Sequence, residues 1–452
     1  MPSNGKKFPE KVKKEGCAVR IFKAGSVPGK RLVERLKRRG QKIPARLERG
    51  VRRILAEVRR RGDEALVDYT RRFDCPNFEV AQLRVREEEI FEAYREVSPE
   101  ILSALRLAIR NVEEFHRRQL SSSWFYTRPE GVFLGQMVRP VSSAGLYVPG
   151  GAGGETPLIS TVVMTAVPAR VAGVPRVAMV SPPNREGRLH PALLVAAAEC
   201  GVTEIYRVGS AWAIAALAYG TETIRSVSVI AGPGNIYVTV AKKLLYGEVG
   251  VDLVAGPSEV LIVADESASA EHLAWDLLAQ AEHDPLATAL LLTPSGRLAR
   301  KVKEALLRAL ERLPRREIAE AALKGQGGIL VTRDLEEALE LANAIAPEHL
   351  ELAVADPFAL LPRVKNAGAV FLGGGTPEAL GDYVAGPNHV LPTMGAARFA
   401  SALSVEVFLR RISLLSYGPE ALAWEGEAAV RLAETEGLFA HAEAVRVRLK
   451  SP

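Results

Sequence analysis

The chain has few cysteines and no long apolar run. Its 452 residues include three cysteines, Cys17, Cys75 and Cys200, and no CxxC pair that would hold a metal or form a redox couple. We therefore expect reduced thiols without a catalytic role. No apolar run approaches the roughly 18 residues that a membrane helix needs, and the basic first residues are not followed by the apolar core of a secretory signal. These absences predict a cytoplasmic protein that does not span a membrane.

The net charge of +6 is distributed unevenly. Residues 1–76 hold 23 Lys and Arg against 9 Asp and Glu, a net of +14, so the remaining chain has a net of −8. Residues 30–39 space their apolar side chains like a surface helix, and no aromatic side chains lie between the charges to stack on bases. We interpret this segment as a solvated helix face rather than a nucleic-acid surface, and we expect no nucleic-acid partner.

The order of sequence patterns indicates an α/β protein. Helical spacing covers about residues 46–120, with a helix start at Ser98 and Pro99. Beyond Val138, short β-branched runs alternate with Ala- and Leu-rich stretches, in two successive series, as in parallel sheets flanked by helices. We predict two incomplete Rossmann-like α/β domains with parallel sheets, an N-terminal helical segment and a small C-terminal helical tail. The predicted divisions are 1–45 for the basic N-terminal helical segment, 46–138 with 258–400 for a discontinuous first α/β domain, 139–257 for the second, and 401–452 for the tail.

A Gln-x-x-His pattern is the first candidate for a metal site. Gln280 and His283 fall on one face at the end of a predicted helix that Pro285 ends. Histidine is the commonest metal ligand, and an amide oxygen can complete a site. The pattern alone is weak, and an ordinary surface helix remains the alternative.

Acids and histidines recur together at three further places. Asp382 and His389 lie in a loop rich in glycine and proline, which favours a functional loop. Glu348 and His349 stand side by side after a proline, an arrangement suited to proton transfer, with a solvent-exposed dipeptide as the alternative. Glu436 precedes His441 by five residues near the chain end, where an ordinary surface pair remains the alternative.

Three glycine-rich segments, 149–154, 231–235 and 255–259, each follow a predicted strand. Glycines there let the backbone approach a ligand closely. None matches GxGxxG or the phosphate-binding GxxxxGK[ST]. From the residues alone, the sequence predicts an α/β enzyme with a metal site.

Five motifs occur in order along the chain: VDLVAGPSEVLIVAD, QAEHD, IAPEHLEL, GDYVAGPNHVLPT and ETEGLFAHAEAVRVRL. Together they resemble the histidinol dehydrogenase family, and the resemblance extends from about Arg53 to the end. It implies NAD-linked oxidation of L-histidinol through L-histidinaldehyde to L-histidine, the last steps of histidine biosynthesis. It also implies one Zn²⁺ per subunit and a homodimer whose tail, residues 401–452, contacts the partner.

The resemblance also implies roles for individual residues. The zinc ligands are Gln280, His283, Asp382 and His441, with His441 contributed across the dimer interface. Glu348 and His349 are the catalytic acid–base pair. NAD contacts fall on Tyr147, Trp212 and Asn235, in the 139–257 domain. The four zinc ligands and His349 also contact the substrate, together with Ser258, His389 and Glu436.

The chain departs from the family pattern in places. Trp212 stands where the family usually has glutamine, and its indole either stacks on a ring of NAD or fills the pocket. The loop PGGAGGETPLIS is richer in glycine than expected, and PTMGAARFAS replaces the usual PTGGTARFSS. One alternative is a paralogous metal-dependent dehydrogenase of another small polar alcohol. Glu436 argues against a sulfonated substrate, because a carboxylate repels one. The other alternative is a zinc- or nucleic-acid-binding protein that has lost turnover.

Overall fold

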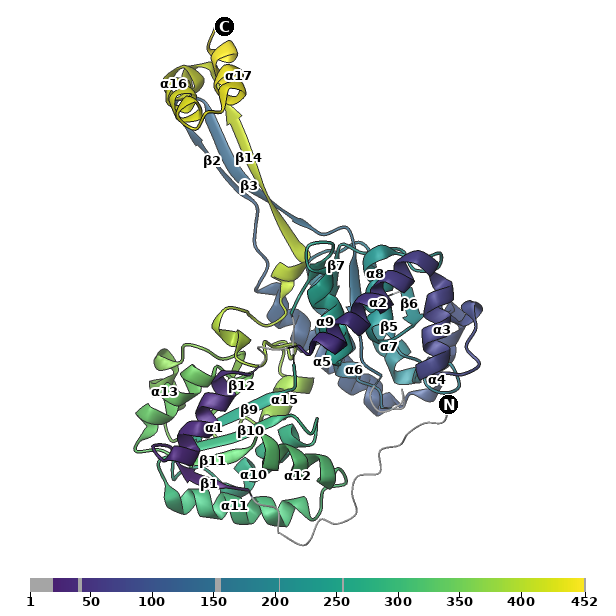
Figure 1. Ribbon diagram of the computed structural model, residues 1–452, viewed down its shortest axis with the longest axis vertical. Helices are drawn as coiled ribbons and strands as arrows, with labels where there is room; N and C mark the ends of the chain where they lie inside the picture. The colour runs from purple at the N-terminus through teal and green to yellow at the C-terminus, as the bar shows by residue number, and fades with distance from the viewer. Residues whose placement is uncertain (1–18, 40–42, 151–155, 203, 254–255, 451–452) are drawn as a thin grey trace.

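The computed structural model describes residues 19–39, 43–150, 156–202, 204–253 and 256–450, which build two parallel sheets and one antiparallel sheet (Figure 1). The first parallel sheet has the order β1-β11-β10-β9-β12-β13. Its strands are β1 (Ile21–Lys23), β9 (Glu259–Ala264), β10 (Thr288–Thr293), β11 (Gly328–Val331), β12 (His349–Ala353) and β13 (Ala369–Leu372).

Helices cover both faces of this six-stranded sheet, which explains why its central strands are buried from end to end. Alternate residues of β9 face opposite sides: Val260 and Ile262 join one apolar cluster, whereas Leu261 and Val263 join the other. The first cluster includes side chains of α10 (Ala270–Ala281), α11 (Gly296–Leu310) and α12 (Arg316–Gly325). The second includes those of α1 (Val27–Lys37) and α13 (Leu335–Ile345).

The second parallel sheet has the order β6-β5-β4-β7-β8. Its strands are β4 (Ala144–Tyr147), β5 (Val177–Ser181), β6 (Glu204–Arg207), β7 (Val229–Ala231) and β8 (Gly250–Val251), and its helices are α6 (Ile159–Val171), α7 (Pro191–Glu199), α8 (Ser210–Tyr219) and α9 (Ile236–Leu245). Four earlier helices pack on these: α2 (Ala45–Arg61) on α8 and α9, α3 (Asp63–Phe73) on α8, α4 (Glu87–Glu96) on α7, and α5 (Pro99–Arg117) on α6. The Ser98 hydroxyl accepts from Ile101 N at the start of α5, as the sequence predicts.

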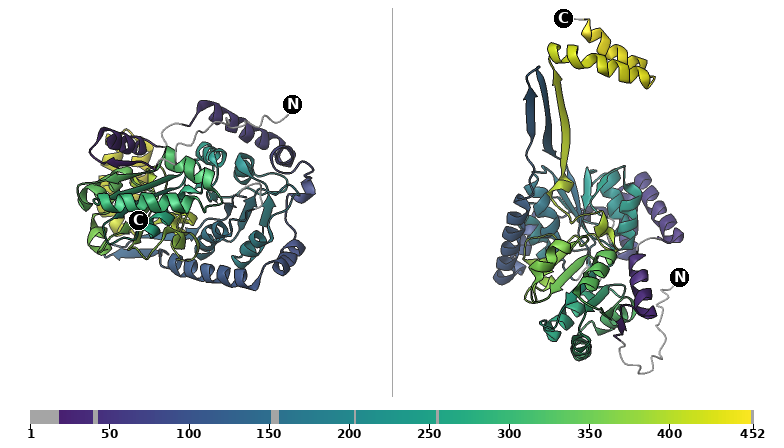
Figure 2. Two further views of the ribbon diagram at one scale, coloured as in Figure 1. Left: turned by 90° about the horizontal axis from the view of Figure 1, so that it is seen from below. Right: turned by 90° about the vertical axis from the view of Figure 1, so that its left-hand side faces the viewer.

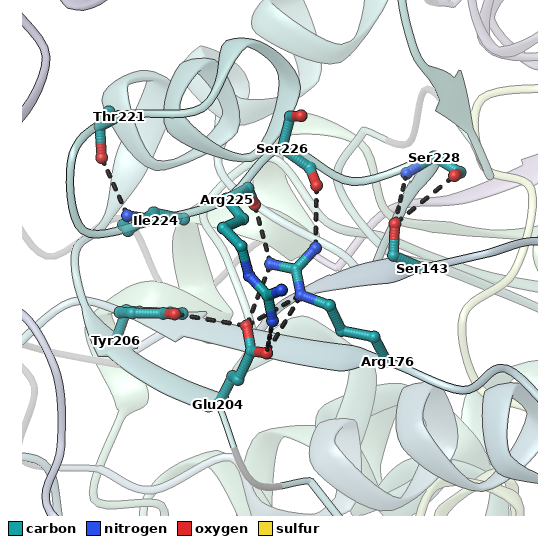
Figure 3. A network of polar contacts seen from close by, with 9 residues as sticks. All are labelled: Ser143, Arg176, Glu204, Tyr206, Thr221, Ile224, Arg225, Ser226 and Ser228. Atoms are coloured by element: carbon teal, nitrogen blue, oxygen red, sulfur yellow. Dashed lines mark hydrogen bonds and ion pairs between the residues drawn. The ribbon is translucent and has the colours of Figure 1, made fainter.

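A polar network ties together the amino ends of these strands (Figure 3). The Glu204 carboxylate binds Arg176 at 3.0 Å and Arg225 at 2.6 Å, while Ser228 N donates to Ser143 Oγ at 3.1 Å. Arg176 also donates to the carbonyls of residues 225 and 226. Because these polar groups bind one another, we assign a structural role to this edge of the sheet.

An arm extends away from both sheets, with two helices at its far end (Figures 1 and 2). It contains β2 (Trp124–Arg128), β3 (Val132–Pro140) and β14 (Leu409–Tyr417), paired antiparallel in the order β14-β3-β2, and then α16 (Pro419–Thr435) and α17 (Phe439–Leu449). Large apolar side chains along it are open to solvent, among them Phe125, Leu415, Trp424 and Phe439, which are 68 to 72% exposed. The remaining elements are α14 (Pro357–Leu360), α15 (Glu378–Tyr383) and the 3-10 turns Val80–Gln82, Leu361–Arg363, Ala396–Arg398 and Val405–Phe408.

The α/β class with parallel sheets and a helical end to the tail is confirmed, but the predicted boundaries differ from the packing. Residues 45–117 pack on the sheet of 144–251 and not on that of 259–372, because their apolar faces join its two clusters. The N-terminal segment includes a strand, β1, which pairs with β11 in the other sheet. The 401–452 tail is not wholly helical, since β14 pairs with β3 along nine residues.

Two smaller expectations concern cysteines and membranes. Cys75 and Cys200 are free and buried, and burial raises the pKa of the Cys200 thiol to about 12, so it is an unreactive thiol. Cys17 lies outside the described residues. No helix in the described ranges is long and apolar enough to cross a membrane.

Candidate active site

The amino ends of two neighbouring strands bring Glu348 and His349 together. Strands β9 and β12 run parallel, and His349 lies beside Val260 in the register. Glu259 N donates to Glu348 Oε2 at 2.8 Å, and Glu259 O lies 2.9 Å from His349 Nδ1. Glu348 is 5% exposed and His349 4%, which excludes the alternative of a solvent-exposed dipeptide.

The hydrogen bond to a carbonyl fixes the protonation of His349. A carbonyl oxygen only accepts, so Nδ1 carries the hydrogen and Nε2 retains its lone pair. Burial, with smaller effects from nearby His389 and His283, lowers the pKa of His349 to about 3. The imidazole is therefore neutral at physiological pH and able to accept a proton at Nε2.

Burial, followed by the charges of Glu259 and Asp382, raises the pKa of Glu348 well above its ordinary value. A carboxylate in such surroundings is a stronger base than one in water. The pair thus places the unprotonated Nε2 of a neutral imidazole beside a carboxyl group whose proton affinity is raised.

Three further acids, Glu378, Glu351 and Asp276, belong to the same cluster. The sequence analysis did not identify them. Glu378 Oε1 is 3.6 Å from His349 Nδ1, and Glu378 N donates to Glu351 Oε1 at 3.2 Å. Burial raises the pKa of Glu378 well above its ordinary value, that of Glu351 to about 8 and that of Asp276 to about 6. The signal for Glu351 was available, because an acid inside the otherwise apolar strand HLELA is exceptional.

Three of the four predicted metal ligands come from elements beside this pair. Gln280 lies in the last turn of α10, His283 lies two residues beyond its end, and Asp382 lies in α15. Gln280 is 1% exposed, and its Oε1 has no hydrogen-bond partner in the part of the chain that the structure describes. Burial lowers the pKa of His283 and raises that of Asp382 to about 6.

An unpartnered buried amide oxygen, an imidazole and a carboxylate are ligand types that a divalent cation accepts. Within the described ranges, no group of three or more His, Cys, Asp and Glu side chains is placed to hold a metal by itself. A site here therefore needs the Gln280 amide and a ligand from elsewhere.

The loop after α15 joins this cluster to the second sheet's helices. His389 Nδ1 lies 3.0 Å from Asp382 O, and its Nε2 lies 3.5 Å from Thr161 Oγ1 at the start of α6. Asn388 donates to the Met164 carbonyl at 2.6 Å. Burial lowers the pKa of His389 to about 4, so it too is neutral.

The remaining substrate candidates are divided between two places. Ser258 directly precedes β9, and its carbonyl accepts from Thr288 N at 3.0 Å, so its backbone is held at the same strand ends. Glu436 ends α16 and His441 lies in α17, both exposed at the far end of the arm (Figure 1). Within one chain these two residues do not join the cluster.

The NAD candidates gather at the carboxyl ends of the second sheet. Tyr147 ends β4, and Asn235 follows the neighbouring strand β7 as the N-cap of α9. The chain leaves β4 toward β5 on one side, while β7 lies on the other, so β4 and β7 flank the point where the strand order reverses. Open α/β sheets bind their ligands at such points. Residues 151–155, which include most of the first glycine-rich segment, lie outside the described ranges.

Trp212 sits behind this edge, in the interior. It is 5% exposed and stacks on Tyr69 and Phe73 with ring centroids 5.4 and 5.5 Å apart. Its Nε1 is buried and has no partner within the described ranges. The indole therefore packs on rings of α3, and its effect on NAD binding stays a prediction.

Over most of its length the chain is similar to proteins of one known family. The family model described as histidinol dehydrogenase matches residues 36–449. The histidinol dehydrogenase of Desulfotalea psychrophila is 54% identical over 426 residues, 94% of this chain and 98% of that protein. That of Carboxydothermus hydrogenoformans is 56% identical over 405 residues, 90% of this chain and 94% of that protein.

The crystal structure of histidinol dehydrogenase from Elizabethkingia anophelis has a TM-score of 0.89 with this chain at 36% sequence identity. The match covers 96% of this chain and 98% of that one. Sequence and fold agree over nearly the whole length of each protein. The chain belongs to the histidinol dehydrogenase family, which oxidises histidinol to histidine with NAD in histidine biosynthesis.

Proposed function

We propose that Glu348 and His349 carry out two successive oxidations of L-histidinol, through bound L-histidinaldehyde, to L-histidine. The observation that carries this proposal is the bond from His349 Nδ1 to the Glu259 carbonyl, which leaves Nε2 of a neutral imidazole to accept a proton. The same backbone residue binds Glu348, so both groups are held against one strand end.

In the first oxidation, His349 Nε2 accepts the hydroxyl proton as a hydride leaves the carbinol carbon. The C–O bond becomes a carbonyl, and the product is the aldehyde. NAD supplies the hydride acceptor in each oxidation. Retaining the aldehyde in a buried site protects it from side reactions.

In the second oxidation, Glu348 accepts a proton from water as the water oxygen bonds to the aldehyde carbon. The resulting hydrate anion loses the second hydride to give the carboxylic acid, which releases a proton to give the carboxylate. Histidinol, water and two NAD⁺ thus become histidine, two NADH and three protons. No cysteine nucleophile is needed, which agrees with the burial of Cys75 and Cys200.

The family uses Zn²⁺ as well as NAD. We assign the zinc ligands to Gln280, His283, Asp382 and His441 of the partner subunit, one ion per subunit. Zinc bound there would orient the amine and imidazole of the substrate. Ser258, His389 and Glu436 would complete the substrate site, and Tyr147 and Asn235, backed by Trp212, the NAD site. These nitrogen and oxygen ligands also suit manganese or cobalt.

The homodimer is part of the same proposal. The helices that hold Glu436 and His441 lie at the end of an extended arm with exposed apolar side chains (Figure 2). Such a surface is typical of an interface, and a two-fold dimer would deliver each arm to the other subunit. We further propose that the enzyme works in the cytoplasm, and that neither nucleic acid nor membrane is a partner.

The metal assignment is tested with the substitution His283→Ala. We expect the variant to lose bound zinc, measured by elemental analysis after gel filtration, and histidinol-dependent NADH formation together. His272→Ala is the matched control, because His272 lies on the same helix but is exposed. A metal-free His283→Ala protein with full activity would refute the assignment.

A further inference from the structure

Arg39 is an interior cation contributed by the N-terminal segment. It follows α1, and its side chain is 9% exposed although the sequence around it predicts a solvated helix face. Its guanidinium donates to Leu36 O at 2.7 Å and to Thr288 Oγ1 at 3.1 Å. It also lies 2.8 Å from Glu259 Oε1. The cation is therefore held at the amino ends of β9 and β10.

The acidic partner of Arg39 is Glu259, and the backbone of Glu259 binds both catalytic side chains. Glu259 N donates to Glu348, and Glu259 O binds His349. The Glu259 side chain is 2% exposed, and its Oε1 also accepts from Met394 N at 3.1 Å. A shift of this one residue would displace Glu348 and His349 at once.

The charge of Glu259 is costly unless it is compensated. Burial raises the pKa of Glu259, and among the groups that oppose this effect Arg39 is the largest and Arg398 a smaller one. The Glu348 carboxylate also faces Glu259, because it accepts the hydrogen bond from Glu259 N. Removing Arg39 would leave two adjacent buried carboxyl groups with only the smaller compensation from Arg398.

We propose that Arg39 is a positioning residue for the acid–base pair: it neutralises and anchors Glu259, whose backbone holds Glu348 and His349. Within the described residues no hydrogen bond or ion pair joins Arg39 to either catalytic side chain, and its link to them runs through Glu259. This inference rests on the proposed roles of Glu348 and His349.

The test measures kcat and KM of the full-length, zinc-loaded enzyme with L-histidinol and, separately, with L-histidinaldehyde. The variants are Arg39→Gln, Arg39→Lys, Arg39→Gln with Glu259→Gln, and Arg38→Gln. Arg38 is the matched control, because it is the adjacent arginine and is exposed. Melting temperature and zinc content are recorded for each variant to establish that it is folded and loaded.

We expect Arg39→Gln to lower kcat about 10- to 100-fold for both substrates, as for other residues that orient catalytic groups, with a smaller change in KM. Arg39→Lys should recover part of the loss. The double variant should recover more, because it removes the uncompensated carboxylate together with the cation. Arg38→Gln should match the wild type.

Two results would overturn the inference while the wild type remains active. One is an Arg39→Gln enzyme with the kcat of Arg38→Gln. The other is a folded, zinc-loaded double variant no better than Arg39→Gln, which would assign Arg39 to local packing. A wild-type enzyme without histidinol-dependent NADH formation would instead refute the proposed function itself.

Discussion

At the scale of single residues, burial sets the chemistry of the candidate site. The imidazoles of His349 and His389 are neutral because burial lowers their pKa values to about 3 and 4. The same burial raises the pKa values of Glu348, Glu351 and Glu378. Bases and proton-holding acids therefore lie together in one interior cluster.

The roles of Glu348 and His349 separate in the two half reactions. Glu348→Gln keeps an oxygen to accept from Glu259 N but removes the base that activates water. We expect oxidation of histidinaldehyde to fall about 10²- to 10⁴-fold, and oxidation of the alcohol to fall less. Single-turnover NADH formation from each substrate measures both. Equal losses in the two halves would contradict the assigned role.

Glu351 links the cluster to the stability of the fold. Its pKa rises from 4.5 to about 8 on folding, so between these pH values the folded chain binds more protons than the unfolded chain. Its contribution to stability is complete below about pH 4.5 and is lost as the pH rises through 8.

Glu351→Gln should therefore flatten the decline in unfolding free energy between about pH 5 and 8, by at most about 1.4 kcal/mol per pH unit. Urea unfolding of both proteins across this range measures the difference. Identical slopes would show that Glu351 is ionised in the folded protein.

At the scale of helices and strands, local patterns predicted most elements but not their grouping. The start of α5 at Ser98 and the strands EVLIVA and HLELA follow directly from caps and apolar runs. The sequence could not predict that the four helices α2, α3, α4 and α5 pack on the second sheet. An amphipathic helix face does not specify the surface it packs against. The strand β14 was missed for a related reason, since LRRISLLSY is largely exposed and pairs with a strand far away in the sequence.

For the candidate site, too, local sequence patterns predicted some residues and missed others. The motifs led to Gln280, His283, Glu348, His349, Asp382 and His389, which the fold gathers into one region. Arg39 and Glu378 were missed because their importance comes from tertiary contacts alone. Glu436 and His441 cannot be joined to the site by one chain.

The stack of Trp212, Tyr69 and Phe73 joins α8 to α3. Because Trp212 is buried, Trp212→Ala should lower the free energy of unfolding by about 3 to 5 kcal/mol. Tyr237→Ala, at an exposed side chain of α9, should change it little and serves as the control. An unfolding free energy unchanged in Trp212→Ala would show that the indole is not packed as described.

At the scale of the whole molecule, the extended arm makes a prediction about shared sites. Glu348→Gln and His441→Ala proteins should each be inactive in histidinaldehyde oxidation. Unfolded together in equal amounts and refolded, they should regain about one quarter of the wild-type rate, because half of the dimers are mixed and each mixed dimer has one intact site.

Refolding each variant alone is the control for recovery. If the mixture stays as inactive as its components although mixed dimers form, His441 does not act in the other subunit. Mixed dimers are counted with two different affinity tags.

The central claim is that one metal-dependent site performs both oxidations, and the most direct test is the stoichiometry of NADH formation. Zinc-loaded and chelator-stripped enzyme are given limiting L-histidinol with excess NAD. We predict two NADH per histidinol consumed, activity lost on stripping, and activity restored by zinc. One NADH per histidinol with free aldehyde accumulating, or full activity in the stripped enzyme, would contradict the account.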